Sequence, residues 1–139
     1  MAKNHEKRQE HESTWIMILL DSNILIYSAS ENFKYLRELL KNPDASCSII
    51  SKLEVLGYHK ITKEQTRYFN AIFKVIKIMP VSGAVITQAI IYRQRKSMSV
   101  GDAIIAASAK IFSCDLYTHN VEDFGNIKDF KIINPIKKK

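Results

Sequence analysis

Short apolar runs alternate with longer amphipathic stretches along most of the chain. The first run, Ile16 to Leu20, stops abruptly on Asp21 and predicts a buried strand. Four further short runs predict strands over residues 45–50, 76–81, 114–118 and 130–133. Strands that are buried on both faces are typical of parallel sheets with helices on each side.

The stretches between these runs carry apolar side chains at helical spacing. They predict helices over residues 23–28, 33–41, 62–75, 84–96 and 99–113, a helix that begins at Ser51, and a loop or short helix over 119–124. Strands that alternate with helices in this way predict an α/β sandwich around a mostly parallel sheet. We find no internal repeat and no second domain in the pattern.

The beginning of the chain follows a different pattern. Residues 1–14 are polar and charged without an apolar period, which predicts a disordered segment, with a short amphipathic arm as the alternative. Met17 lies at the beginning of the first apolar run and is a candidate native start. We therefore predict a disordered extension over residues 1–16 and a single folded domain over residues 17–139.

The composition is that of a globular protein and excludes several other classes. The chain has 139 residues, 46% hydrophobic and 25% charged, which is enough for one domain with its own core. Its two cysteines, Cys47 and Cys114, are too few for a disulfide framework or a zinc site, so we expect reduced, buried thiols in a cytoplasmic protein. No apolar run is long enough to span a membrane.

Basic residues outnumber acidic ones, and the formal net charge is +7. Residues 1–16 are charge-balanced, so the excess lies in residues 17–139, with 18 basic against 11 acidic side chains. A basic domain suits a polyanionic partner, most simply nucleic acid. A basic surface that serves solubility alone is the alternative that charge leaves open.

Four acidic residues fall where the predicted elements meet. Asp21 closes the first strand, Glu54 follows the second, Asp102 lies at the start of an alanine-rich helix, and Asp123 follows the fourth strand. In parallel sheets, ligands bind outside the carboxyl ends of the strands. Carboxylates are the hard oxygen ligands that Mg²⁺ or Mn²⁺ prefer, and two such ions can flank a scissile phosphate. The spacing therefore allows an acidic metal site.

Three of these acids also have a purely structural interpretation. Ser51 and Glu54 have the spacing of a capping box, in which Glu54 only caps its helix. Asp102 and Asp123 lie in similar helix-start patterns, where an acid stabilises the first turn. Asp21 differs because it ends a buried strand, where we expect no capping role.

The segments around the four acids resemble those of PIN-domain ribonucleases, specifically the VapC-type toxins. Four segments match in family order: Leu20–Ile24, Ser51–Tyr58, Gly101–Ala109 and Leu116–Phe124. Each motif is short, but together they span most of residues 17–133, and each carries its acid in the expected place.

The resemblance implies a PIN-like three-layer α/β/α sandwich and a site that holds one or two Mg²⁺ or Mn²⁺ ions. The implied metal ligands are Asp21, Glu54, Asp102 and Asp123, and the implied catalytic set adds the polar pair Thr118 and Asn120.

Other positions of the implied site follow the family less closely or have smaller roles. By resemblance, Asn120 would orient Asp123 or a water, and Ser22 and Asn23 would line the site. His119 stands where the family often has arginine, and a neutral imidazole cannot replace a guanidinium as a phosphate contact. Gly101, directly before Asp102, is a second departure that adds backbone freedom.

The function that these observations favour is Mg²⁺- or Mn²⁺-dependent hydrolysis of RNA phosphodiester bonds by an endoribonuclease. The resemblance also implies a VapBC-type toxin that forms a homodimer and pairs with a small antitoxin protein. The alternative is a catalytically silent RNA-binding PIN module. A receiver-like phosphoacceptor domain is a third hypothesis, disfavoured because no lysine ends a strand where that fold needs one.

Overall fold

Five parallel strands form the centre of the molecule. The computed structural model describes residues 16–137, so the disorder predicted for residues 1–16 falls, except for Ile16, outside the described residues. The strands are β1 (Met17–Leu20), β2 (Ala45–Ser48), β3 (Lys77–Met79), β4 (Cys114–Tyr117) and β5 (Ile132–Ile133). They form one sheet in the order β3-β2-β1-β4-β5, in which every neighbouring pair is parallel.

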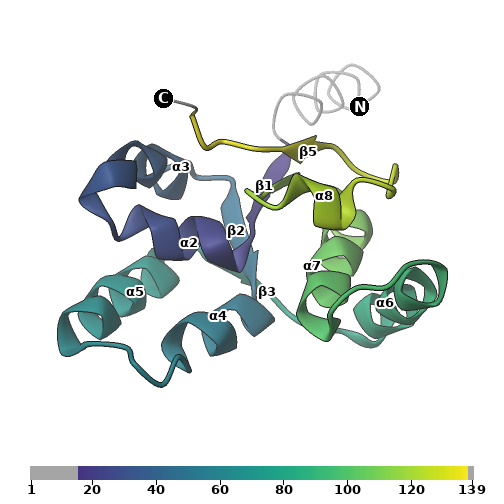
Figure 1. Cartoon of the computed structure of the whole chain (residues 1–139), viewed down its shortest axis with the longest axis horizontal. Helices are drawn as coiled ribbons and strands as arrows, with labels where there is room; N and C mark the ends of the chain where they lie inside the picture. Colours follow the sequence, from purple (N-terminus) through teal and green to yellow (C-terminus); the bar gives the residue numbers. More distant parts are fainter. Residues whose placement is uncertain (1–15, 138–139) are drawn as a thin grey trace, which may run out of the picture.

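Helices connect these strands and lie on both sides of the sheet (Figure 1). They are α2 (Ser22–Ser28), α3 (Arg37–Leu40), α4 (Ile49–Leu56), α5 (Lys63–Val75), α6 (Gly83–Arg95), α7 (Val100–Ile111) and α8 (Val121–Phe124), with a 3₁₀ helix, η1 (Glu31–Leu36), before α3. The predicted fold class, an α/β sandwich around a parallel sheet, is confirmed.

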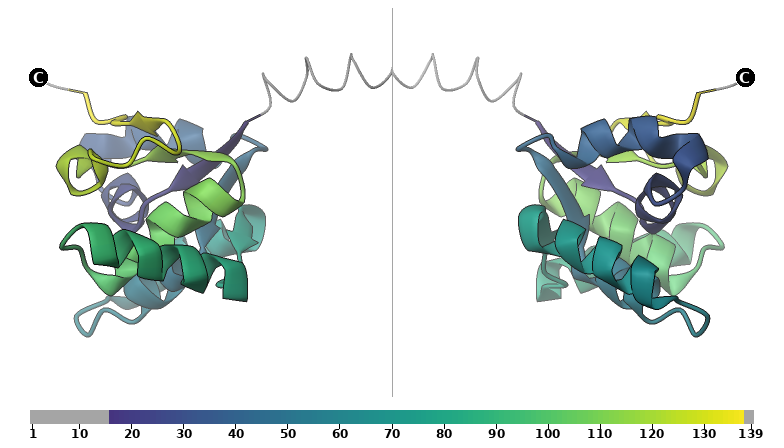
Figure 2. Two further views of the ribbon diagram at one scale, coloured as in Figure 1. Left: turned by 90° about the vertical axis from the view of Figure 1, so that its right-hand side faces the viewer. Right: turned by 90° about the vertical axis from the view of Figure 1, so that its left-hand side faces the viewer.

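The two cores on either face of the sheet follow from the alternation of side chains along β1. Leu19 faces a core that α6 and α7 complete, whereas Ile18 and Leu20 face a core that α2, α4 and α5 complete. Figure 2 shows α6 and α7 at one side of the sheet and α5 at the other. Both faces are covered, which gives the three layers that the sequence predicts.

The second strand is shorter than predicted, and the helix after it begins earlier. The run 45–50 reads as one strand, but β2 ends at Ser48, whose hydroxyl accepts a hydrogen bond from the Ile50 amide at 3.1 Å and caps α4. A short apolar run does not distinguish strand from helix, and Ile49 and Ile50 belong to the helix. The helix therefore begins before Ser51, and the predicted capping box of Ser51 and Glu54 is wrong.

Other boundaries also move. The helix predicted over residues 33–41 is η1 followed by α3, and the backbone inside η1 is not helical at Phe33 (φ −121°, ψ 24°). The strand predicted over residues 130–133 is reduced to the two residues of β5.

The prediction about the cysteines agrees with the described residues. Cys47 and Cys114 are buried and unbonded to each other, and burial raises the pKa of Cys47 to about 12 and that of Cys114 to about 11. They are therefore inert packing groups at neutral pH. Between residues 16 and 137, none of the helices is long and apolar enough to cross a membrane.

Candidate active site

The connections of the sheet change direction between β1 and β4. The chain runs from β1 to β2 and β3 on one side and then returns to place β4 and β5 on the other. In open parallel sheets, the crevice beside such a switch point, outside the carboxyl ends of the strands, is where ligands bind. Asp21 directly follows β1 and Thr118 directly follows β4, so both lie at this crevice.

Asp21 is a buried carboxylate with a hydrogen bond to each oxygen. Only 4% of the residue is exposed. Oδ1 accepts from the Ser22 amide at 2.8 Å, and Oδ2 accepts from the Thr118 hydroxyl at 2.8 Å. The first of these bonds makes Asp21 the N-cap of α2, because this helix begins at Ser22 and not at residue 23. The expectation that Asp21 has no capping role is therefore wrong.

Thr118 links the carboxyl ends of the two central strands. Its buried hydroxyl donates to Asp21 and accepts from the Asn120 amide at 3.0 Å. It thus fixes both the Asp21 carboxylate and the turn that leads into α8. Asn120 is the N-cap residue of α8, and its side chain makes no capping bond there. Thr118 and Asn120 therefore lie together at the site, in different roles.

Glu54 reaches the site from α4 through a hydroxyl of α2. The Ser22 hydroxyl lies 2.7 Å from Glu54 Oε1 and 2.8 Å from the Ser51 hydroxyl. A hydroxyl carries one proton, and the charged carboxylate is the stronger acceptor, so Ser22 donates to Glu54 and accepts from Ser51. Ser51, which the sequence suggested as a helix cap, instead supports this buried chain of hydrogen bonds.

Gly101 provides the space that the Glu54 carboxylate occupies. A Cβ at position 101 would lie 3.0 Å from Glu54 Oε2, closer than ordinary contacts allow. The glycine interpreted from the sequence as added backbone freedom sits inside α7. Its physical role in the fold is this close approach of α7 to the side chain of α4.

Asp102 lies in the first turn of α7, close to the other acids. Its amide donates to the hydroxyl of Ser99, the N-cap, at 3.0 Å, as the sequence predicts. Burial raises the pKa of Asp102 above its ordinary value of 3.8, and the negative charges of Asp123 and Glu54 raise it further. Hydrogen bonding to Ser99 and the charge of Lys96 act in the opposite direction.

The pKa of Asp21 is raised for similar reasons. Burial is the largest cause, and repulsion from Asp102 and Glu54 adds to it, whereas the bonds from Thr118 and Ser22 lower it. Each of the four predicted acids therefore interacts electrostatically with at least one other. The structure brings Asp21, Glu54 and Asp102 into mutual repulsion and links Asp123 to them through Asp102.

Asp123 is exposed on the short helix α8. Lys96, at the end of α6, contacts this helix. The Lys96 ammonium donates to the backbone carbonyls of Glu122 and Asp123, each at 2.9 Å. The contact joins segments that are distant in sequence, and no local pattern signals it.

The acids can be compared with the donor set that the implied divalent metal requires. Within residues 16–137, no three histidine, cysteine, aspartate or glutamate side chains converge closely enough to form a ready metal-binding group. The chemistry fits nonetheless, because oxygen donors that repel one another are what a hard divalent cation stabilises. Asp123 is exposed, so its carboxylate has room to turn toward Asp102. The residues fit the metal in the kind of donor that they supply.

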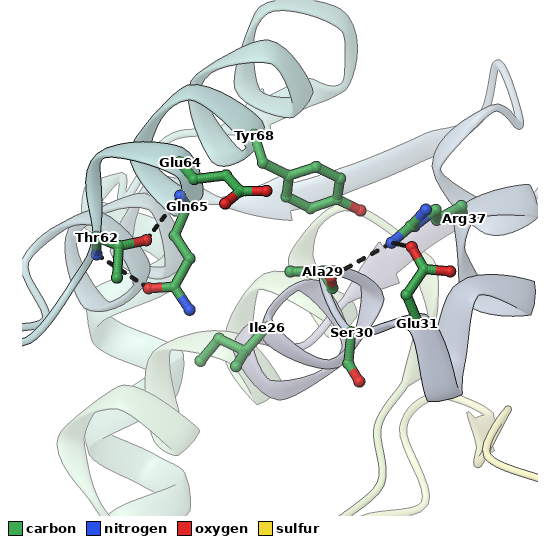
Figure 3. Close-up of a pocket in the computed structure, with 9 residues that line it drawn as sticks. All are labelled: Ile26, Ala29, Ser30, Glu31, Arg37, Thr62, Glu64, Gln65 and Tyr68. Atoms are coloured by element: carbon green, nitrogen blue, oxygen red, sulfur yellow. Dashed lines mark hydrogen bonds and ion pairs between the residues drawn. The ribbon is translucent and has the colours of Figure 1, made fainter.

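Two hollows differ in their relation to these acids. One of about 320 Å³ is lined by residues of the β4–α8 turn and α8, including His119, Asn120 and Asp123. A larger one, of about 640 Å³, lies where α5 faces α2 and η1, with Arg37 and Tyr68 among the side chains around it (Figure 3). None of the four predicted acids lines the larger hollow.

Comparison with protein families gives one match. The model of the PIN domain family matches residues 18–129, a span that includes all four acids. No curated protein sequence matches the chain.

Solved structures share the fold over nearly their whole length. A toxin–antitoxin complex from Klebsiella pneumoniae is 25% identical, with a TM-score of 0.71 over 87% of this chain and 99% of that chain. FitAcB from Neisseria gonorrhoeae is 24% identical, with a TM-score of 0.67 over 86% of this chain and 98% of that chain. VapBC2 from Rickettsia felis, bound to a DNA fragment from its promoter, is 18% identical, with a TM-score of 0.69 over 86% and 98%.

Proposed function

The chain belongs to the PIN domain family, and on that premise we propose that it is a metal-dependent endoribonuclease, the VapC-type toxin of a toxin–antitoxin pair. The observation that carries the proposal is the group of acids at the switch point of the sheet. Asp21 and Asp102 have raised pKa values partly because they repel each other and Glu54. Such coupled acids in a crevice are typical of functional sites.

We propose that Asp21, Glu54, Asp102 and Asp123 hold one or two Mg²⁺ or Mn²⁺ ions. When bound, such ions stabilise charge that develops on a phosphodiester and lower the pKa of a water. The chain itself orients the ligands: Thr118 holds Asp21, and Ser22 holds Glu54. Their bonds reduce the rotamer freedom that metal binding would otherwise have to remove.

The polar residues around the acids have proposed roles of their own. Asn120 begins α8 with its side chain not used for capping, which leaves its amide available to orient Asp123 or a water. Ser22 and Asn23, at the start of α2, would line the site. His119, at the hollow beside Asp123, stands where the family often has arginine, and its imidazole does not replace the phosphate contact of a guanidinium.

RNA is the proposed substrate because of charge. Setting aside the four acids of the site, residues 17–139 carry 18 basic and 7 acidic side chains. Such a surface attracts a polyanion, and its affinity falls as salt increases. We place the protein in the cytoplasm, where RNA and reduced thiols such as Cys47 and Cys114 occur together.

The proposed partners are a small antitoxin protein and a second copy of the chain. Structures with the same fold include toxin–antitoxin complexes. Leu53 and Tyr58, on either side of Glu54 in sequence, are 67% and 52% exposed, so α4 and the turn after it carry open apolar surface. An antitoxin that covers this surface would also block the site. Light scattering of the isolated chain tests the homodimer.

A catalytically silent RNA-binding module is the second candidate. It is favoured by one observation, that no three acidic, cysteine or histidine side chains between residues 16 and 137 converge as they stand. RNA cleavage separates the two candidates. We expect the purified protein to cut single-stranded RNA with Mg²⁺ or Mn²⁺ and to stop when a chelator is added. Binding without cleavage under every metal condition would support the silent module.

A further inference from the structure

A second hollow of about 320 Å³ lies between the end of α6 and the segment that follows α8. Figure 1 shows this segment, in yellow, leaving α8 on the α6 side of the molecule. Three cationic side chains line the hollow, Arg95, Lys96 and Lys128, together with one acid, Asp129. The hollow is therefore basic, and no residue of the four-acid site lines it.

The one acid is already satisfied by groups of the protein. Asp129 Oδ2 accepts from the Tyr92 hydroxyl at 2.7 Å and lies 3.6 Å from the Lys110 ammonium. The bond from Tyr92, followed by the charge of Lys110, lowers the pKa of Asp129, so it is ionised at neutral pH. Its contact with Tyr92 also fastens the segment after α8 to α6, which holds Lys128 near Arg95.

The three cations form no close ion pair, although the charge of Arg95 acts on Asp129 and that of Lys96 on Asp102. Over residues 16–137, no salt bridge involves Arg95, Lys96 or Lys128. Arg95 and Lys128 are exposed, so their charged groups are accessible from solvent. An unpaired guanidinium and ammonium on one rim are suited to oxygens of a phosphate, which the guanidinium contacts with two parallel bonds.

Lys96 connects this hollow to the acids. Its ammonium donates to the carbonyl oxygens of Glu122 and Asp123, and its charge contributes to the pKa of Asp102. Lys96 therefore lies between the hollow and the carboxylates. A polyanionic strand that crosses the acids toward Lys96 would find cations without salt bridges at this rim.

We propose that this basic hollow is a subsite for a backbone phosphate of the RNA strand, next to the phosphate that is cut. The inference rests on the proposed function and adds a direction for the bound RNA. From the acids, the RNA strand runs toward α6 and away from α5. Arg95 and Lys128 contact the phosphate, and the exposed amide of Asn126 at the same rim can donate to it. None of these contacts reads the base, so the subsite positions the strand without selecting sequence.

The test compares two double variants with the same loss of charge. Arg95→Ala with Lys128→Ala removes the subsite, whereas Lys63→Ala with Lys74→Ala removes two exposed cations of α5. Binding of a fluorescent single-stranded RNA oligonucleotide is measured by anisotropy in chelator over a range of salt. We expect the subsite variant to bind about tenfold or more weakly, and its log–log salt slope to become shallower by about 0.7 for each phosphate that the protein no longer neutralises. The α5 variant should keep the wild-type slope.

The outcomes separate this subsite from the proposed function. Equal decreases of affinity and equal slopes in the two variants, with wild-type protein that still binds and cleaves RNA, would overturn the subsite alone. A wild-type protein that binds no RNA at any salt would overturn the proposed function and the subsite with it. Thermal melts of both variants show whether they are folded, and Lys128→Ala alone, at an exposed position, should show part of the effect.

Discussion

The pKa of Asp21 shows that the candidate site destabilises the fold when no metal is bound. Its pKa and that of Asp102 are raised above the ordinary value of 3.8. An acid whose folded-state pKa is raised binds its proton more tightly in the native state, so its ionisation destabilises the fold. The free energy of unfolding should therefore fall as pH rises from 3.8 through the raised values. A bound cation would reverse this effect.

Glu54→Gln tests whether Glu54 takes part in this repulsion. The amide oxygen of Gln can still accept from Ser22, but the charge that repels Asp21 and Asp102 is removed. We expect the melting temperature in chelator to rise, by roughly 4 °C for each kcal/mol of repulsion relieved. The stabilisation that Mg²⁺ or Mn²⁺ provides should shrink, because it depends on affinity for the native site. Cleavage should fall in the same variant.

The measurement is a set of thermal melts of wild type and Glu54→Gln, each with metal and with chelator. Glu64→Gln is the matched control, because Glu64 is exposed in the first turn of α5, away from the acids. Its metal-induced shift should equal that of wild type. If Glu54→Gln also keeps the full shift, Glu54 has no part in metal binding.

At the residue scale, the sequence indicates the four acids but not the contacts that hold them. Asp21 follows a strand, and Asp102 and Asp123 lie in the first turn of a helix, whereas Glu54 lies in the second turn of α4. The capping interpretation of Glu54 fails because Ser48, and not Ser51, begins the helix. Ser22 and Glu54 are separated by 31 other residues, so their bond depends on tertiary packing that no local pattern reports.

At the scale of elements, α4 and α7 meet where the site needs them, and Gly101 permits this contact. Gly101→Ala places a Cβ 3.0 Å from Glu54 Oε2, so the flexible Glu54 side chain must move. Alanine is the better helix former by up to about 1 kcal/mol. We therefore expect the free energy of unfolding in chelator to stay equal or rise, while RNA cleavage falls.

Gly83→Ala is the control for this separation of stability and activity. Gly83 begins α6, and a Cβ there would meet no atom within 4 Å. Denaturant unfolding and cleavage rates of both variants provide the comparison. Gly101→Ala with wild-type cleavage would show that the position of Glu54 against α7 does not matter for activity.

Element boundaries were predictable where a helix has a strong local signal. Helix α5 begins after Thr62, which forms a true capping box with Gln65, close to the predicted start at residue 62. The start of α4 was not predictable. Two serines, Ser48 and Ser51, flank apolar residues that suit either a strand or a helix. Packing, and not propensity, decides such cases.

At the scale of the whole molecule, the parallel sheet was predictable because strands and helices alternate along the chain. The order of the strands was not, since alternation does not say on which side of β1 the later strands lie. Parallelism alone places the carboxyl ends of β1, β2 and β4 at one edge, and with them Asp21 and the segments that carry Glu54 and Asp123. Asp102 lies at the start of α7, which follows α6 and not a strand. The contact of Lys96 with α8 depends on the tertiary fold, and no pattern in the sequence predicts it.

We propose that the folded nuclease domain begins at Met17, where β1 starts and one residue before the family match begins. A chain that starts at Met17 should therefore keep its melting temperature within about 2 °C. We expect the free energy of unfolding to change by less than ~0.5 kcal/mol, and such a change shifts the melting temperature little. Its rate of RNA cleavage should also be unchanged. Thermal melts and cleavage assays of the two lengths test this, and aggregation or inactivity of the shorter chain would show that residues 1–16 support the fold.

The central claim is that the acids at the switch point act together in metal-dependent cleavage of RNA. The most direct measurement is the cleavage rate of Asp21→Asn and Asp102→Asn in Mn²⁺, beside Asp115→Asn, a control within β4. We expect the cleavage rates of both site variants to fall to the rate that wild type shows in chelator. Their circular dichroism should still show a folded protein. Asp115→Asn should keep the wild-type rate. Cleavage at the wild-type rate in either site variant would contradict the account.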